Sequence, residues 1–315
     1  MIRLLGRRLV FVGHISVDKV ENVNGIRVQP GGAALYAAMA ARTLSPNVVL
    51  ISATGKDNQF LDVLKLLPYR DVKIYDAPST MFHIKYDRRW EAHYLKADHG
   101  AGSRITSRRI SDRWLRHKSI FHISPMQPSK VARIVDKIKQ RSPETLVSVN
   151  TWIDYIRKGQ KNRKTLKDIA LKADFFIVND TEAKALAQTD SLSSAVRLLK
   201  AKNLILTLGD LGAIVNGEDV GLQLIHASTL PLDKLVDTTG AGDVWCGAFL
   251  AMYNLTEDLP KSISAASTIS RIKCSDWGFQ SLINLHFKEP NDVIEFVMGL
   301  KDGGIQKRML DYMKD

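Results

Sequence analysis

Short apolar runs recur along the chain and constrain its fold more than any other feature. They are LVFVG, VVLISATG, SIFHIS, TLVSVN, ADFFIVND and NLILTLG, at residues 9–13, 48–55, 119–124, 145–150, 173–180 and 203–209. Most do not alternate with polar residues, which is typical of strands buried on both faces of a parallel sheet. Helices are predicted at 31–44, 57–67, 129–140, 163–172, 191–200, 240–253 and 262–271. This alternation predicts a layered α/β/α sandwich with a mostly parallel central sheet.

The composition is that of a chain with ample material for a buried core. Its 315 residues are 45% hydrophobic and have a mean hydropathy of −0.11. Because α/β folds of this length often form one body, we expect a single domain over 1–315. No apolar run approaches the roughly 18 residues that cross a bilayer. The two cysteines, Cys246 and Cys274, argue against a disulfide framework and predict a cytoplasmic protein.

The net charge of +12 raises the question of a nucleic-acid partner. Lysine and arginine cluster at 103–118 and 156–167, but neither cluster has interleaved aromatic residues or a nucleic-acid motif. Since charge runs are mostly solvated helix faces, we favour that interpretation and expect neither a nucleic-acid nor a membrane partner.

One region follows a different pattern. Residues 81–96 alternate apolar and polar side chains around the turn-like stretch 87–89, which predicts an antiparallel hairpin. Residues 19–30 contain a second turn signal, Asn24-Gly25. The two segments, roughly 19–30 and 79–98, predict a small sheet outside the main one. It would be a lid over a site, a surface for a homodimer, or both.

The stretch VDTTGAGDVWCGAFL holds the strongest signal for function. Gly240, Ala241 and Gly242 precede a predicted helix, and glycine lets backbone N–H groups approach a ligand closely. Such N–H groups, together with the positive end of a helix dipole, form an anion site. A short glycine pattern is weak evidence by itself, because many turns look alike.

Asp243 allows two interpretations. It could merely stabilise the helix dipole from the first turn. Alternatively, it is a base that takes a proton from an attacking hydroxyl while the neighbouring N–H groups hold a transferred phosphoryl group. In the second case the anion site and the carboxylate are adjacent because the reaction joins them.

The stretch DTTGAGDVWCGAFL resembles the second hallmark motif of the ribokinase-like (PfkB) carbohydrate kinases, whose form is close to D-T-x-G-A-G-D-x-F-x-G. Trp245 replaces the phenylalanine of that motif. The resemblance implies that Asp243 is the catalytic base and that the backbone of Gly240, Ala241 and Gly242 forms the anion hole. It also implies the fold of that family, a sandwich with a small β lid.

Further segments resemble the family in the same order, over roughly residues 8 to 290. GHISVD at 13–18 matches the place of an aspartate that binds sugar hydroxyls, which implicates Asp18. PGGAALYAAMAARTL at 30–44 resembles the first hallmark, in which Gly31 and Gly32 let substrate approach the backbone. Each has a plainer interpretation, since Asp18 could cap a turn and the glycines could open a helix.

The nucleotide side is implied by two more matches. NDTE at 179–182 matches the family's N-x-x-E, so that Asn179 and Glu182 would organise Mg²⁺, its water and the phosphates. TLGDLGA at 207–213 resembles the strand and turn along the nucleotide, which implicates Thr207, Gly209 and Gly212. Asn179 with Glu182 is also what a capped helix start looks like.

Tyr36 departs from the family pattern, which places a substrate-binding asparagine there. A phenol keeps one hydroxyl but loses the second amide donor and adds bulk. As a substrate-binding residue it resembles the myo-inositol kinase branch and argues against ribose-like recognition. Alternatively, Tyr36 packs under the lid.

The resemblance implies an ATP- and Mg²⁺-dependent kinase that phosphorylates a hydroxyl of a small sugar or polyol. Whether a monovalent cation is a further cofactor stays open. The alternatives are a nucleoside kinase of the same fold and a catalytically silent metabolite-binding protein. A phosphorylated sugar also stays open, because Arg88, Arg89 and Lys96 lie near the proposed lid. A dinucleotide-binding dehydrogenase is excluded, since GHISVD stands where G-x-G-x-x-G should follow the first strand. The tail at 303–315 has no functional interpretation.

Overall fold

The computed structural model describes residues 7–115, 119–226, 235–288, 292–293 and 295–296. Contacts within the chain define two compact units: unit 1 (Met1–Ile105 and Ser228–Asp315) and unit 2 (Thr106–Ala227). The single domain over 1–315 stays a prediction, and the tail at 303–315 lies outside the described residues. In the described ranges, none of the helices has the length and apolarity needed to span a membrane.

The parallel strands of unit 1 are β1 (Arg8–Val12), β4 (Val48–Gly55) and β5 (Tyr69–Tyr75), in the order β1-β4-β5. Every residue of β4 is buried, and its unbroken apolar run pairs in register with β1, Val10 opposite Val49. The runs predicted at 9–13 and 48–55 are therefore strands. The sequence of β5, YRDVKIY, is largely polar and half-exposed. It contains no apolar run, so this strand was not predicted.

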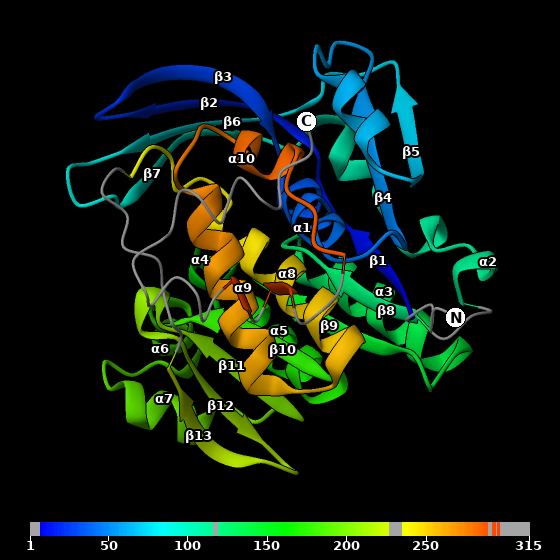
Figure 1. The fold of residues 1–315 in the computed structure, drawn as a ribbon. Coiled ribbons are helices and arrows are strands. Elements are labelled where there is room, and N and C mark those ends of the chain that lie inside the picture. Colours follow the sequence, from blue (N-terminus) through cyan, green and yellow to red (C-terminus); the bar gives the residue numbers. More distant parts are fainter. Residues whose placement is uncertain (1–6, 116–118, 227–234, 289–291, 294, 297–315) are drawn as a thin grey trace. The chain divides into compact units, whose positions relative to one another are not determined.

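Three long helices of unit 1 pack together: α1 (Ala33–Arg42), α8 (Ala241–Thr256) and α9 (Leu259–Lys273) (Figure 1). Gly247 lies where α8 meets α1, because a Cβ there would come within 2.0 Å of the Ala37 carbonyl oxygen. Glycine at this motif position thus permits a close helix crossing. Trp245, which replaces the motif's phenylalanine, donates its indole N–H to Ser267 of α9 at 3.1 Å.

Unit 1 also contains the short helix α10 (Gln280–Ile283) and the 3₁₀ helices η1 (Leu61–Leu66) and η2 (Gly100–Arg104). The helix predicted at 57–67 is therefore a 3₁₀ segment over 61–66, so the prediction of an ordinary helix was wrong. The stretch has no side-chain cap at its start.

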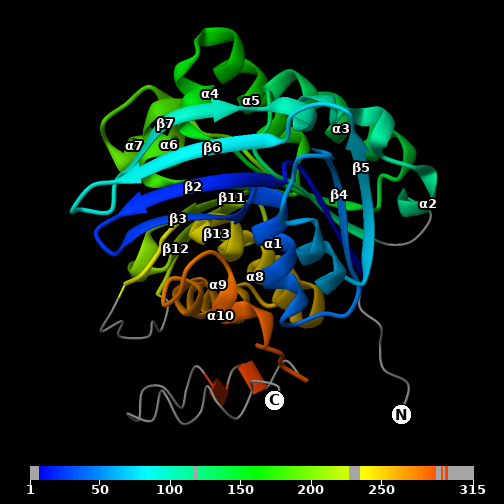
Figure 2. The same cartoon turned by 90° about the horizontal axis from the view of Figure 1, so that it is seen from above.

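A second sheet of unit 1, the small sheet, has the order β3-β2-β6-β7 (Figure 2). Its strands are β2 (Ser16–Asn22), β3 (Gly25–Gly31), β6 (Thr80–Tyr86) and β7 (Ala92–Asp98). Strand β2 pairs antiparallel with β3 and parallel with β6, and β6 pairs antiparallel with β7. The predicted accessory sheet is confirmed. The β2–β3 turn is centred on Val23 and Asn24, one residue earlier than expected, since Asn22 pairs with Gly25.

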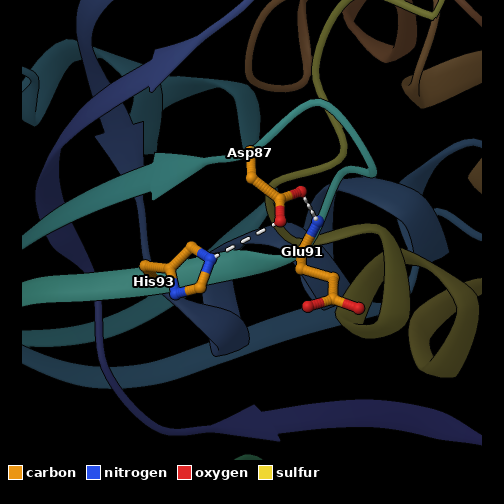
Figure 3. A group of neighbouring side chains, drawn as sticks. All are labelled: Asp87, Glu91 and His93. Carbon is orange, nitrogen blue, oxygen red and sulfur yellow. Dashed lines mark hydrogen bonds and ion pairs between the residues drawn. The ribbon is translucent and has the colours of Figure 1, made fainter.

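Asp87 and Glu91 of the turn between β6 and β7 form a group with His93 of β7 (Figure 3). Asp87 accepts the N–H groups of Arg89 and Glu91 at 2.8 and 3.0 Å, and its other oxygen lies 3.7 Å from His93 Nε2. The carboxylate thus satisfies backbone donors of the turn. We therefore interpret this group as one that stabilises the β6–β7 hairpin.

Unit 2 carries the parallel strands β8 (Ser119–Ile123), β9 (Leu146–Asn150), β10 (Phe175–Asn179) and β11 (Asn203–Thr207), which confirms four predicted runs. Beyond β11 the sheet continues with β12 (Ala213–Gly217), which pairs antiparallel with β11, and β13 (Gly221–Ile225), which pairs antiparallel with β12. Its helical segments are η3 (Ser107–Arg109), α2 (Asp112–Leu115), α3 (Pro128–Arg141), α4 (Ile153–Arg157), α5 (Gln160–Lys172), α6 (Asp180–Ala187), α7 (Leu192–Leu198) and η4 (Gly209–Leu211). Within each unit, strands and helices alternate as predicted for an α/β protein.

Candidate active site

The glycine-rich motif of unit 1 begins at a fully buried carboxylate, Asp237. One carboxylate oxygen, Oδ1, accepts the N–H of Thr239 at 2.8 Å. The other, Oδ2, accepts Gln29 Nε2 at 3.0 Å and the N–H of Gly278 at 2.9 Å, and lies 3.4 Å from Lys273 Nζ. A buried carboxylate is expensive unless it is paired and hydrogen-bonded, and Asp237 has both kinds of partner. It therefore ties its own loop to β3, to the end of α9 and to the segment after it.

Two asparagines of the β2–β3 turn hold the segment just before the motif. Asn22 Nδ2 donates to the carbonyl of Val236 at 3.0 Å, and Asn24 Nδ2 donates to the carbonyls of Leu235 and Val236 at 2.9 and 3.0 Å. On the other side, the N–H of Val236 donates to the carbonyl of Cys274 at 2.9 Å. These hydrogen bonds fix the backbone position of the segment that leads into the glycine-rich loop.

Tyr36 of α1 lies beneath the loop. Its side chain is 1% exposed, its hydroxyl accepts a 3.3 Å hydrogen bond from Gln29, and its ring meets Phe279 edge-on. A Cβ at Gly240 would come within 2.5 Å of the Tyr36 ring, and Gly240 has a φ of 72°. The ring therefore supports the loop at a position that requires glycine for two independent reasons. This geometry favours the packing alternative for Tyr36 over contact with a substrate.

Helix α8 begins directly after Gly240, so Gly242 and Asp243 lie in its first turn. The N–H of Ala241 donates to the carbonyl of Thr238 at 3.1 Å, and Ser270 of α9 donates to the carbonyl of Ala241 at 2.8 Å. The side of Gly242 is open, since a Cβ there would meet nothing within 4 Å. First-turn N–H groups have no acceptor within their own helix, which suits this place to an anion.

Asp18 of β2 is the second carboxylate that the structure brings to this region. Its side chain is 2% exposed and accepts the Ser16 hydroxyl at 2.6 Å. The pKa of Asp18 is raised to about 7, mainly by burial and further by the charges of Asp237 and Asp243, against the opposing hydrogen bonds from Ser16 and the Gly32 N–H. Asp18 and Asp243 therefore share one electrostatic environment within unit 1, as an acceptor-binding group and a base would need.

The glycines of the first motif make room for Asp18. A Cβ at Gly31 would fall 1.8 Å from Asp18 Oδ2, and a Cβ at Gly32 would fall 2.4 Å from the carbonyl oxygen of His14. Gly32 also has a φ of 101° and is the N-cap residue of α1. Gly32 thus serves the helix entry, and Gly31 leaves the space that the Asp18 carboxylate fills.

The predicted nucleotide residues all lie in unit 2. Asn179 Oδ1 accepts the N–H of Glu182 at 2.8 Å, and Glu182 Oε2 accepts the N–H of Asn179 at 3.1 Å, so the pair forms a capping box for α6. Asn179 ends β10 opposite Thr207, the last residue of β11. The pairing places both side chains at the carboxyl edge of parallel strands, where open α/β sheets bind ligands.

The turn after β11 requires glycine twice. Gly209 has a φ of 57° and Gly212 a φ of 107°, and the N–H of Leu208 donates to the carbonyl of Gly212 at 2.9 Å. A Cβ at Gly209 would meet nothing within 4 Å, so this side of the turn is open. Both glycines serve the turn into β12, and the open side leaves room for a ligand.

Sequence reasoning missed Gln29 and Lys273, and it gave Asp237 no role. Asp237 opens the hallmark motif, which was a signal that could have been followed. Gln29 follows the four exposed residues that begin β3, and Lys273 at a helix end looks like an ordinary C-terminal cation. No local pattern distinguishes such residues from solvated ones.

The raised pKa of Asp18 predicts how stability depends on pH. Between about 4 and 7 the folded chain keeps a proton that the unfolded chain has released, so the free energy of unfolding falls as pH rises through this window. Asp18→Asn removes this loss. We expect the variant to resemble wild type in urea unfolding at pH 4.5 and to be more stable by roughly 1–4 kcal/mol at pH 8.5.

Asp76→Asn, at a side chain that is 91% exposed, is the matched control and should show no such divergence. An equal stability difference between Asp18→Asn and wild type at both pH values would contradict the assignment.

Comparison with known proteins agrees with this geometry. Residues 7–284 match the model of the pfkB family of carbohydrate kinases. A cytidine kinase of Thermococcus kodakarensis is 27% identical over 282 residues, which cover 87% of this chain and 98% of that protein. A ribokinase of Lactococcus lactis is 26% identical over 289 residues, covering 85% and 91% respectively.

Solved structures show the same fold. The nucleoside kinase of Burkholderia thailandensis in complex with inosine superposes with a TM-score of 0.75 at 20% identity and covers 92% of this chain and 98% of that one. Ribokinase from Giardia lamblia gives a TM-score of 0.75 at 18% identity, with coverages of 91% and 99%. The chain therefore belongs to the pfkB family of carbohydrate kinases and has their ribokinase-like α/β fold.

Proposed function

We propose that this kinase transfers the γ-phosphoryl group of ATP to a hydroxyl of a small sugar or polyol. The observation that carries the proposal is the shared environment of Asp18 and Asp243 beside the glycine loop. Asp18 would accept a hydrogen bond from the acceptor, and Asp243 would take the proton of the attacking hydroxyl. Gly240 and Gly242 would supply anion-hole N–H groups, while the N–H of Ala241 is already engaged with Thr238.

Unit 2 would bind the nucleotide. Asn179, Thr207 and the turn at Gly209 and Gly212 lie at the carboxyl edge of β10 and β11, which suits the phosphates and the ribose of ATP. Amide and carboxylate oxygens are what Mg²⁺ prefers, so Asn179 and Glu182 fit a role in holding the ion through water. When bound, Mg²⁺ would neutralise charge on the phosphates.

The small sheet would cover the acceptor and exclude water, which limits ATP hydrolysis at the site. Its inner end is anchored through Gln29, so closure would involve the outer parts of the hairpins. Ile26, Val28 and Leu95 of this sheet are 63%, 50% and 57% exposed, which supports a homodimer through the same surface. The likeness to the myo-inositol branch rested on Tyr36 and gains no support from a buried ring.

A nucleoside is the second candidate acceptor, and one observation favours it. Phe82 lies opposite Asp18 in the neighbouring parallel strand, so the two side chains share a face of the small sheet. The ring is half-buried and meets Tyr94 edge-on at 6.0 Å. Aromatic rings stack on nucleobases, whereas a polyol offers no such face. The cytidine kinase among the relatives agrees with this candidate.

Substitution of the base tests the catalytic assignment. Asp243→Asn keeps the shape of the side chain but cannot accept the proton, so kcat should fall by about two to four orders of magnitude. ATP affinity should stay near wild type or rise, because a negative charge near the γ-phosphate is lost. Steady-state kinetics and ATP titration measure both effects.

Asp154→Asn is the matched control, because Asp154 also lies in the first turn of a helix. It should leave kcat unchanged. A folded Asp243→Asn protein with near-normal turnover would refute the assignment of the base.

The acceptor class is tested by ADP release across pentoses, hexoses, inositols, nucleosides and sugar phosphates, with wild type and Phe82→Ala. If a nucleoside is the acceptor, loss of one stacking ring should reduce its kcat/KM by about 5- to 150-fold. Bare sugars should be affected much less. Tyr69→Ala, at an exposed aromatic residue of β5, serves as control.

Equal loss for nucleosides and bare sugars in Phe82→Ala would count against the nucleoside. Transfer to a sugar or polyol with no detectable transfer to nucleosides would settle the class in favour of the first candidate.

A further inference from the structure

Lys273 is the last residue of α9, and its side chain is 0% exposed. Lysine is almost never fully buried unless its charge is paired. Its Nζ donates to the backbone carbonyl oxygen of Asp237 at 2.6 Å and lies 3.4 Å from Asp237 Oδ2. The same nitrogen lies over the Tyr36 ring, 5.6 Å from its centroid. Among the described residues, the ammonium thus contacts a carbonyl oxygen, a carboxylate oxygen and an aromatic face.

All three partners are ones that favour a cation. Carbonyl oxygens replace the hydration shell of monovalent metal ions, carboxylates neutralise them, and aromatic faces attract any positive charge. An added K⁺ or Na⁺ that neutralised Asp237 would have to contact the same oxygens. In this chain the Lys273 ammonium already occupies that place, so the oxygens do not fit an exchangeable ion.

The pKa shifts of the two residues reflect this contact. Burial alone would raise the pKa of Asp237, but Lys273, Gln29 and Thr239 outweigh it and hold the pKa below its ordinary value. Burial lowers the pKa of Lys273, and the charge and hydrogen bond of Asp237 oppose that shift. The lowered pKa of Asp237 favours its carboxylate form, and the 3.4 Å between Lys273 Nζ and Asp237 Oδ2 is the geometry of an ion pair.

The charge acts on the loop that starts the proposed anion hole. Asp237 orients its loop through Thr239, and Gly240 then rests on the Tyr36 ring before α8 begins. Lys273 contacts Asp237 and faces Tyr36 at once. Removing its charge would leave a buried carboxylate unpaired at the start of the loop, and the first-turn N–H groups would lose their fixed direction.

We propose that Lys273 is a positioning residue that acts as a built-in monovalent cation, so that phosphoryl transfer does not depend on an added one. The proposal rests on the proposed function, because it concerns the loop that would hold the phosphoryl group. It assigns the role of a bound monovalent cation to a side chain of the protein itself.

The test compares wild type, Lys273→Ala and Lys273→Met in the full chain. Lys261→Met is the matched control, since Lys261 belongs to the same helix and its side chain is 49% exposed. For each protein, kcat and the KM for ATP are measured in sodium, potassium, ammonium and tetramethylammonium chloride at one ionic strength. Melting temperatures are recorded in the same salts.

We expect the kcat of wild type and of Lys261→Met to vary less than about twofold between salts, because screening is constant. Lys273→Ala should lose about 10²-fold in kcat, the usual effect of a disturbed anion hole, with a nearly unchanged KM. Ammonium or potassium should enter the vacated space and restore about tenfold of kcat, whereas tetramethylammonium is too large to do so. Lys273→Met should show the loss without rescue, because the thioether fills the space.

Three kinetic results would overturn the proposal. The first is a wild-type kcat that requires potassium or ammonium. The second is a folded Lys273→Ala protein whose lost kcat no cation restores, as for a merely structural residue. The third is a near-normal kcat in folded Lys273→Met, which decides the matter even if Lys273→Ala does not fold.

The melting temperatures separate this proposal from the proposed function. If wild type phosphorylates no acceptor, the proposed function fails. A melting temperature of Lys273→Ala that rises in ammonium but not in tetramethylammonium would still support the role of the Lys273 charge. A melting temperature that is the same in all four salts would overturn it.

Discussion

The buried pair of Asp237 and Lys273 is the interaction on which the rest of the site in unit 1 depends. Through its two carboxylate oxygens Asp237 binds β3, the segment after α9 and its own loop, and Lys273 joins this group to the end of α9. A buried ion pair is weak evidence for stability as such, since an apolar substitute of similar volume is often as good. What it supplies here is one defined arrangement of several segments that are distant in the sequence.

That arrangement explains why the loop carries glycines at these places. Gly240 needs a positive φ and also lies against Tyr36, whereas Gly242 has open space beside it. Gly247 serves a different purpose, the close crossing of α8 and α1. One hallmark motif therefore contains a glycine for conformation, a glycine beside open space and a glycine for packing, and only the second is placed where a ligand could approach.

Asp18, in contrast to the ion-paired Asp237, is a buried carboxylate whose charge lowers the stability of the folded chain. Asp18 is buried near two other negative charges, so its charged form is unfavourable in the folded chain. Nothing in the packing requires a carboxylate there, and the glycine beside it leaves room for it at the expense of a side chain. Strained electrostatics of this kind is expected where a group must bind a substrate.

Much of the fold could be predicted from the sequence, because unalternated apolar runs and their spacing report parallel strands directly. Strands β5 and β13 were not predicted, since their polar or exposed residues carry no such signal. Strand β12 was not predicted either, because its short sequence AIVNG has no long apolar run. In the site, Asp18 and Asp243 could be found from motifs. The contact of Tyr36 with Gly240 and the burial of Lys273 could not, because both depend on contacts between segments that are far apart in the sequence. The assignments of the individual site residues stay predictions.

A double-mutant cycle on Asp237→Asn and Lys273→Met tests the central claim most directly, with the free energy of unfolding in urea as the measured quantity. If the pair organises this part of unit 1, each single change leaves a buried charge without its counter-charge, and the double change removes both charges. The coupling energy should then reach at least about 1.5 kcal/mol, within the range found for interacting buried charges. Additive effects within about 0.5 kcal/mol would contradict the account, because they would mean that the two residues stabilise the fold independently.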